Sequence, residues 1–128
     1  MNVLSALLKR SALRVSILLV EVCPLNTHLT FEELMRSPIN YVYGYYLMAS
    51  YLYYVRYVDS PFTDPEFDQL CKRLLTEWDD VTHKNKNLSS PELLKAGTGY
   101  SIQAWEYPGG LRWCADRWKE AYDKRGEE

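Results

Sequence analysis

The sequence has few cysteines and histidines, and their spacing matches no metal site. Its three cysteines, Cys23, Cys71 and Cys114, are an odd number, lie far apart and form no Cys-x-x-Cys pair. This argues against a disulfide scaffold or a zinc centre and fits a reducing cytosol. The two histidines, His28 and His83, lie in polar stretches without partners at ligand spacing. We therefore expect no metal and no catalytic histidine.

The sequence also lacks a hydrophobic run long enough to cross a membrane. An apolar stretch from Val15 to Val20 follows the basic residues Lys9, Arg10 and Arg14, and Glu21 interrupts it. That order is typical of a signal peptide, but no clear small-x-small cleavage site follows. The stretch is far shorter than the ~20 apolar residues of a membrane span. The sequence therefore predicts no membrane association and a cytoplasmic location.

Neither sign of charge dominates. Fifteen basic and seventeen acidic residues give a net charge of −2, which argues against a broad phosphate-binding surface. Nucleic acid is therefore not the expected direct partner. The 128 residues are enough for one compact core and too few for two ordinary domains.

Tyrosine is abundant instead. The chain has 11 tyrosines and four tryptophans, and eight of the tyrosines lie between Tyr41 and Tyr57. Tyrosine combines a large contact area with a polar tip, so it suits a stacking pocket or an interface as well as a core. A helix here would place the tyrosines on two neighbouring faces, and the face that includes Tyr53 could line a ligand site. The alternative is that both faces are buried.

Residues 1–37 are interpreted as an N-terminal extension. Thr30-Phe-Glu-Glu33 matches a capping box, which predicts a short helix just after Thr30. Met35 is an alternative start, so residues 1–34 are either dispensable or form an amphipathic helix that packs weakly. Residues 38–128 are expected to form a single helical domain.

The expected fold class is mainly α: a small helical domain built on an antiparallel helical hairpin, with an extended segment and a C-terminal helix. Capping signals and a 3.6-residue period predict helices over Phe31–Arg36, Ile39–Val58, Asp64–Asp79, Pro91–Ala96 and Leu111–Lys124, and an extended segment over Tyr100–Tyr107. The hairpin comprises residues 38–79. Gly97-Thr-Gly lacks the lysine and the third glycine of phosphate-binding loops, so we interpret it as a helix C-cap and a turn.

The candidate site lies where the two hairpin helices meet. Five side chains fall at the helix ends and are expected to converge on one concave spot: Tyr53, Tyr54, Asp64, Phe67 and Asp68. Aromatic side chains can hold a planar ring, and carboxylates accept hydrogen bonds from ligand hydroxyls. The alternative is an ordinary hairpin, with Asp64 as a helix-start residue and Asp68 in an ion pair with Lys72 four residues on.

The segment Tyr51–Asp68 resembles part of a known domain. Its pattern is aromatic-Leu-Tyr-x, a short turn with Asp and Pro, then x-Asp-x-Glu-aromatic-Asp. It is similar to the N-terminal Ia domain of bacterial NAD-dependent DNA ligases, whose helical hairpin binds the nicotinamide mononucleotide half of NAD. The resemblance implies that Tyr53 and Phe67 stack on the nicotinamide ring. It also implies that Asp64 and Asp68 bind the rest of the ligand.

The chain departs from that family's pattern at three points. Tyr54 falls on the position of a histidine, Phe67 lacks the hydroxyl of the usual tyrosine, and the loop Arg56–Thr63 is one residue longer than usual. The similar region runs from about Tyr41 to about Trp78, roughly a third of the chain.

The resemblance implies recognition without catalysis. Ligases of this family adenylate a lysine in a Lys-x-Asp-Gly motif, which this chain lacks. We therefore expect a non-catalytic module that binds nicotinamide mononucleotide or NAD, and no enzyme. The alternative is a small interaction or inhibitor protein, encoded by a phage or mobile element, that acts on a host protein in DNA metabolism or defence. In that case Trp105, Trp113 and Trp118 would be expected to serve as exposed anchors.

Overall fold

The computed structural model describes residues 29–127, except for the side chains of the last two. These residues form no strand; their α-helices are α2 (Phe31–Leu34), α3 (Ile39–Tyr54), α4 (Asp64–Thr76), α5 (Pro91–Ala96) and α6 (Gly109–Glu127). Three short 3-10 helices lie between them: η1 (Trp78–Asp80), η2 (Lys86–Leu88) and η3 (Ala104–Glu106). The expected mainly α fold is confirmed.

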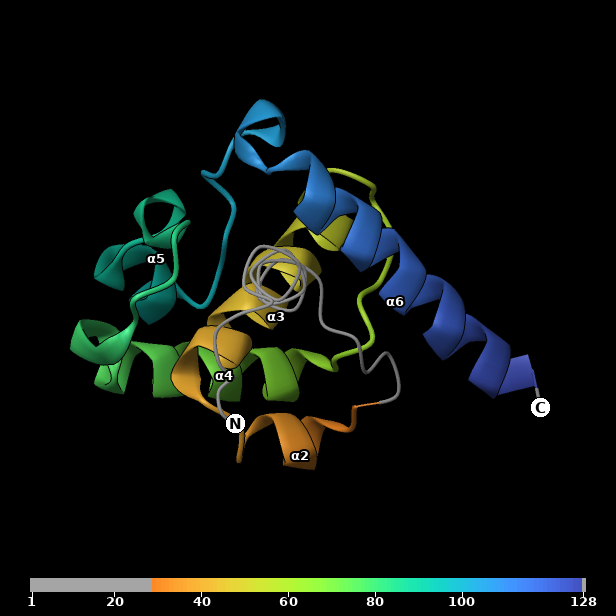
Figure 1. Cartoon of the computed structure of the whole chain (residues 1–128), viewed down its shortest axis with the longest axis horizontal. Coiled ribbons are helices and arrows are strands. Elements are labelled where there is room, and N and C mark those ends of the chain that lie inside the picture. The colour runs from red at the N-terminus through yellow and green to blue at the C-terminus, as the bar shows by residue number, and fades with distance from the viewer. Residues whose placement is uncertain (1–28, 128) are drawn as a thin grey trace, which may run out of the picture.

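Helix α3 lies at the centre of the molecule (Figure 1). It packs on α4 along one side and on α6 along another, while α5 packs on α4. In Figure 1, α3 rises from the lower left and α4 returns below it from right to left. The hairpin predicted over residues 38–79 is thus formed by α3 and α4.

Both tyrosine faces of α3 are buried over most of its length. Every residue from Val42 to Leu52 is buried except Gly44, which is half-buried. Helices enclosed on all sides carry apolar or aromatic residues all around, and this one does. Its two ends reach the surface, where Tyr41 is 38% and Tyr53 56% exposed.

Helix α3 ends four residues before the predicted end at Val58. The amide of Val58 donates to the carbonyl of Leu52 at 3.0 Å, and that of Arg56 donates to Tyr51 at 3.2 Å. Between these two donors lies Tyr57, whose φ of 58° is left-handed, as is common just beyond a helix end. Glycine usually occupies this position, so the sequence contains no signal for the stop.

Helix α4 begins where the sequence predicts. The Thr63 hydroxyl accepts the Glu66 amide at 3.3 Å, and the Glu66 carboxylate accepts the Thr63 amide at 2.9 Å. Such a cap stabilises a helix by about 1 kcal/mol. Helix α4 ends at Thr76, and η1 replaces the predicted last turn. Helix α5 has its predicted bounds, with Gly97 as a left-handed C-cap at φ 68°.

The described end of the predicted N-terminal extension packs on the hairpin. Leu34 of α2 is buried, and the ring of Phe31 meets that of Phe62 edge-on at 5.8 Å. The Arg73 guanidinium donates to the carbonyls of Met35 at 2.7 Å and Ser37 at 2.9 Å. Removal of residues 1–34 would therefore take Leu34 out of the core. The rest of this prediction, that residues 1–34 are dispensable, falls on residues 1–28, which lie outside the described range.

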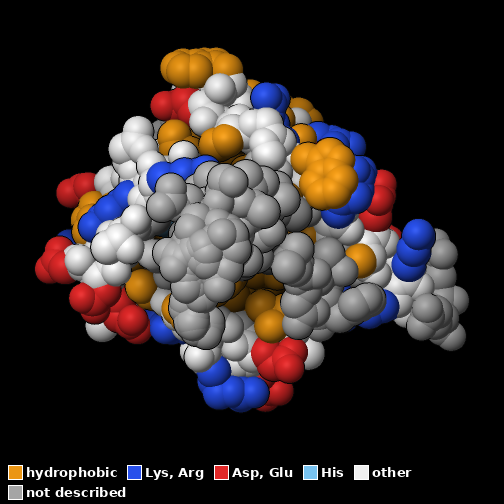
Figure 2. Space-filling view, in the orientation of Figure 1, with side chains coloured by type: hydrophobic (Ala, Val, Ile, Leu, Met, Phe, Trp, Pro, Cys, Tyr) orange, Lys and Arg blue, Asp and Glu red, His pale blue; other side chains and the backbone are white. Residues whose placement is uncertain are grey.

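The segment Tyr100–Tyr107 is not a strand but a turn followed by η3. Ile102 and Tyr107 are buried in the core, while Trp105 between them is 78% exposed. Figure 2 shows large hydrophobic side chains at the upper edge of the molecule and at its upper right. On the visible face, acidic and basic side chains are interspersed.

The cysteines differ in part from expectation. Cys71 is a buried free thiol, as predicted, and burial raises its pKa to about 12. Cys114, however, is disulfide-bonded, which the cysteine spacing, used above as an argument against a disulfide scaffold, did not predict. Disulfides persist mainly in oxidising compartments, so the cytoplasmic location stays a prediction. Within residues 29–127, no helix combines the length and apolarity needed to cross a membrane.

We predict a steep loss of stability above pH 10. Burial raises the pKa of Tyr45 from 10.0 to about 12, and it also raises the pKa values of Tyr43, Tyr46 and Tyr107. Above pH 10 the unfolded chain loses these protons first, so it binds fewer protons than the folded protein. The free energy of unfolding should hold its value below pH 10 and then fall by about 1.4 kcal/mol per pH unit for each buried tyrosine.

Urea unfolding at several pH values would measure this slope. The variant Tyr45→Phe should reduce it, whereas Tyr57→Phe should leave it unchanged because Tyr57 is 85% exposed. Equal slopes for both variants and the wild type would contradict the prediction.

Candidate functional site

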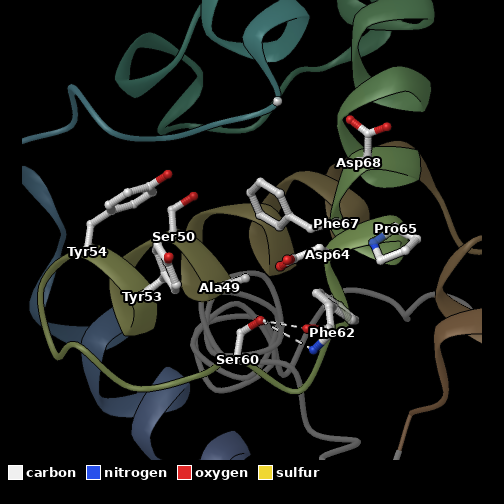
Figure 3. A pocket seen from close by; sticks show the side chains of 11 residues that line it. Ala49, Ser50, Tyr53, Tyr54, Ser60, Phe62, Asp64, Pro65, Phe67 and Asp68 are labelled. Carbon is white, nitrogen blue, oxygen red and sulfur yellow. Dashed lines mark hydrogen bonds between the residues drawn. The ribbon is translucent and has the colours of Figure 1, made fainter.

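A cavity of about 560 Å³ opens where the C-terminal end of α3 meets the N-terminal end of α4 (Figure 3). Its size is within the usual range for small-molecule sites. The residues that line it are Ala49, Ser50, Tyr53, Tyr54, Ser60, Phe62, Asp64, Pro65, Phe67, Asp68 and Gly97. They come from α3, the α3–α4 loop, the first turns of α4 and the C-cap of α5.

Aromatic rings stand on opposite sides of this cavity. Figure 3 shows Tyr53 and Tyr54 on one side and Phe67 on the other. The Tyr53 and Tyr54 rings meet edge-on, with centroids 4.9 Å apart. The Phe67 ring stacks on Tyr46, at 5.6 Å and an interplanar angle of 22°. A flat ligand ring has aromatic partners on two sides here.

The acidic side chains come from the first two turns of α4. Asp64 is exposed in the first turn of α4. Within the described residues it has no hydrogen bond or ion pair. Asp68 forms the alternative ion pair with Lys72, at 3.3 Å between Oδ2 and Nζ. Both partners are more than half exposed, and such pairs contribute ~0–1 kcal/mol, so this one leaves Asp68 available to a ligand.

The loop after α5 forms one wall. The Tyr54 hydroxyl and Thr98 Oγ1 share a hydrogen bond of 2.6 Å, and the Tyr46 hydroxyl donates to the Thr98 carbonyl at 2.8 Å. Gly97 is left-handed, and a Cβ at this position would lie 3.2 Å from Oδ1 of Asp68. Tyr54 is thus held in place through its hydroxyl.

Ser50 lies between the two aromatic sides. Figure 3 shows its side chain between Tyr54 and Phe67. Ser50 is 1% exposed, and its hydroxyl has no hydrogen-bond partner among the described residues. The other serine that is buried among residues 29–127, Ser89, shares a 2.8 Å hydrogen bond with the Tyr46 hydroxyl.

All five residues singled out from the sequence line this one cavity, and the segment Tyr100–Tyr107 does not fill it. Six other lining residues were not predicted: Ala49, Ser50, Ser60, Phe62, Pro65 and Gly97. Ser50 shares a helix face with Tyr53, and this was the only sequence signal for it. Gly97 was predicted only as a C-cap, because sequence gives no measure of which loop lies over which helix.

The described residues contain no group of three or more histidine, cysteine, aspartate or glutamate side chains placed to hold a metal ion. The cavity's own chemistry is two carboxylates, serine and tyrosine hydroxyls and aromatic faces. That set can bind a flat ring that carries hydroxyl groups.

We predict that Gly99→Ala is destabilising. An added Cβ would lie 2.8 Å from the Cβ of Ser50 and would also overlap its hydroxyl. Overpacking of this kind costs about 1–3 kcal/mol. The matched control is Gly109→Ala, where an added Cβ meets nothing within 4 Å. Urea unfolding should show a lower midpoint for the first variant only, and equal midpoints would contradict the close packing of this loop on α3.

Comparison of the chain with protein-family models, curated proteins and solved structures found no match. The resemblance to the ligase Ia domain therefore stays a prediction, based on residues 51–68. The arrangement of side chains around the cavity does not depend on that resemblance.

Proposed function

We propose that this protein is a non-catalytic binding module for nicotinamide mononucleotide or NAD. The observation that carries the proposal is the common cavity lined by Tyr53, Tyr54, Asp64, Phe67 and Asp68. They are the residues that the ligase resemblance assigns to this ligand.

The aromatic residues support a stacking role. The edge-on contact with Tyr54 limits the positions open to the ring of Tyr53, and the stack on Tyr46 does the same for Phe67. Rings held in place lose little freedom on binding, which favours affinity. Each base-like ring stacked on an aromatic side chain contributes about 1–3 kcal/mol.

The charges support a ligand with a positive ring and hydroxyl donors. Asp64 and Asp68 give the cavity two negative charges, and no lysine or arginine of the described residues lines it. Carboxylates accept strong hydrogen bonds from ribose hydroxyls and attract the positive nicotinamide ring. The ligand's phosphate would then point toward solvent, away from the carboxylates.

We expect nicotinamide mononucleotide to bind with a dissociation constant between about 1 mM and 1 μM, as suits a small module. Tyr53→Ala should weaken binding about 5- to 150-fold by removing one stacking partner. Isothermal titration calorimetry measures both values. The control is Tyr41→Ala, which removes another exposed tyrosine of α3, at 38% exposure and outside the cavity. Absence of binding at millimolar ligand would refute the proposal.

A second variant tests the carboxylates. Asp68→Asn should weaken binding about threefold to tenfold, through the loss of a charge-assisted hydrogen bond at an exposed site. Its matched control is Asp123→Asn, which breaks an ion pair with Lys119 of the same spacing and the same 3.3 Å length on α6. Equal affinities for the two variants would mean that the ligand does not contact Asp68.

A second candidate function, protein interaction, is favoured by the exposed tryptophans. Trp105 is 78% and Trp113 57% exposed, whereas Trp118 is buried. Exposed tryptophans are the usual anchors of protein interfaces. On this view the hairpin is a scaffold, and the partner is a host protein of DNA metabolism or defence.

Affinity capture from a host lysate separates the two functions. A partner that binds the wild type and Tyr53→Ala, but not a Trp105→Ala/Trp113→Ala double variant, would support the interaction protein. A partner retained equally by all three proteins would not use these tryptophans.

A further inference from the structure

We infer that Ser50 recognises the polar edge of the ligand ring, the carboxamide of nicotinamide. This rests on the proposed function and adds a specificity-determining residue that the ligase resemblance does not assign. The starting observation is that Ser50 lines the cavity and is 1% exposed, with no partner for its hydroxyl among the described residues.

A buried hydroxyl without a partner is costly to a folded protein. Most buried polar groups have a hydrogen-bond partner, and each exception calls for an explanation. A serine inside a helix commonly bonds to the carbonyl four residues earlier. Ser50 makes no such bond to Tyr46. Alanine would stabilise the helix better at this position, so the hydroxyl is best explained by a ligand group that reaches it.

The surroundings of Ser50 select the kind of group. The hydroxyl lies between the aromatic sides formed by Tyr54 and Phe67 (Figure 3). A ring held between those sides would present its edge to this hydroxyl. Gly99 packs directly on the Ser50 side chain, which limits its movement. A hydroxyl both donates and accepts, and a carboxamide offers an oxygen acceptor and an amide donor.

The neighbouring charges disfavour a ring that carries a carboxylate in place of the carboxamide. Asp64 and Asp68 line the same cavity, and a carboxylate on the ring, as in nicotinate, would be repelled by both. A neutral carboxamide avoids this cost while keeping the hydrogen bond to Ser50. The cavity therefore favours the amide over the acid form of the same ring.

Two proteins and two ligands test the inference by calorimetry: the wild type and Ser50→Ala, each with nicotinamide mononucleotide and with the analogue whose pyridinium ring lacks the carboxamide. Removing the carboxamide should weaken binding to the wild type about fivefold to tenfold, as expected for one neutral hydrogen bond. The same removal should change binding to Ser50→Ala by less than about twofold, because the carboxamide and the Ser50 hydroxyl act as a pair.

Thermal unfolding without ligand supplies a further readout. Ser50→Ala should have a midpoint equal to or above that of the wild type, because it removes an unpaired hydroxyl. Ser89→Ala is the contrast: it should lower the midpoint, because the Ser89 hydroxyl bonds to Tyr46.

The outcomes are distinguishable. Binding by the wild type with equal carboxamide effects in both proteins would overturn the role of Ser50 and leave the proposed function standing. Absence of binding by the wild type would refute the proposed function and this inference together. A lower midpoint for Ser50→Ala would mean that its hydroxyl already has a structural partner, and this too would overturn the inference.

Discussion

Helix α3 is enclosed by protein from Val42 to Leu52, so a tyrosine hydroxyl on it must find a polar partner inside the core. The Tyr43 hydroxyl bonds to the carbonyls of Asn85 at 2.8 Å and Lys86 at 3.0 Å. The Tyr46 hydroxyl bonds to the Thr98 carbonyl beyond α5. The segments before and after α5 are therefore held to the central helix by hydrogen bonds that its tyrosines require.

The same bonds set the shape of the cavity. Tyr46 connects Thr98 to Phe67: its hydroxyl donates a hydrogen bond to the Thr98 carbonyl, and its ring stacks on that of Phe67. Tyr54 reaches Thr98 as well, from the last turn of α3. The wall after α5 and the aromatic sides are thus parts of one network. The two candidate functions share this scaffold and differ in the surface they use: the cavity, or the tryptophans near η3 and on α6.

Local signals predicted much of the fold. The capping box of Thr63 and Glu66 and the C-cap at Gly97 depend on residues within one helical turn, and both are present as expected. The end of α3 was predicted wrongly because a tyrosine, Tyr57, takes the left-handed conformation that glycine normally marks. Next to Tyr57, a contact with another helix is present: Arg56 forms an ion pair with Asp116 of α6 at 2.6 Å.

The sequence by itself determined the helices, the hairpin and the five residues at its bend, because periodicity and capping are properties of short stretches of chain. Only the tertiary structure decided which surfaces close over that bend. The packing of Gly99 on Ser50 and the hydrogen bonds of Tyr46 and Tyr54 to Thr98 involve segments far apart in sequence. Such contacts depend on how the helices pack together, and no local pattern in the chain records them.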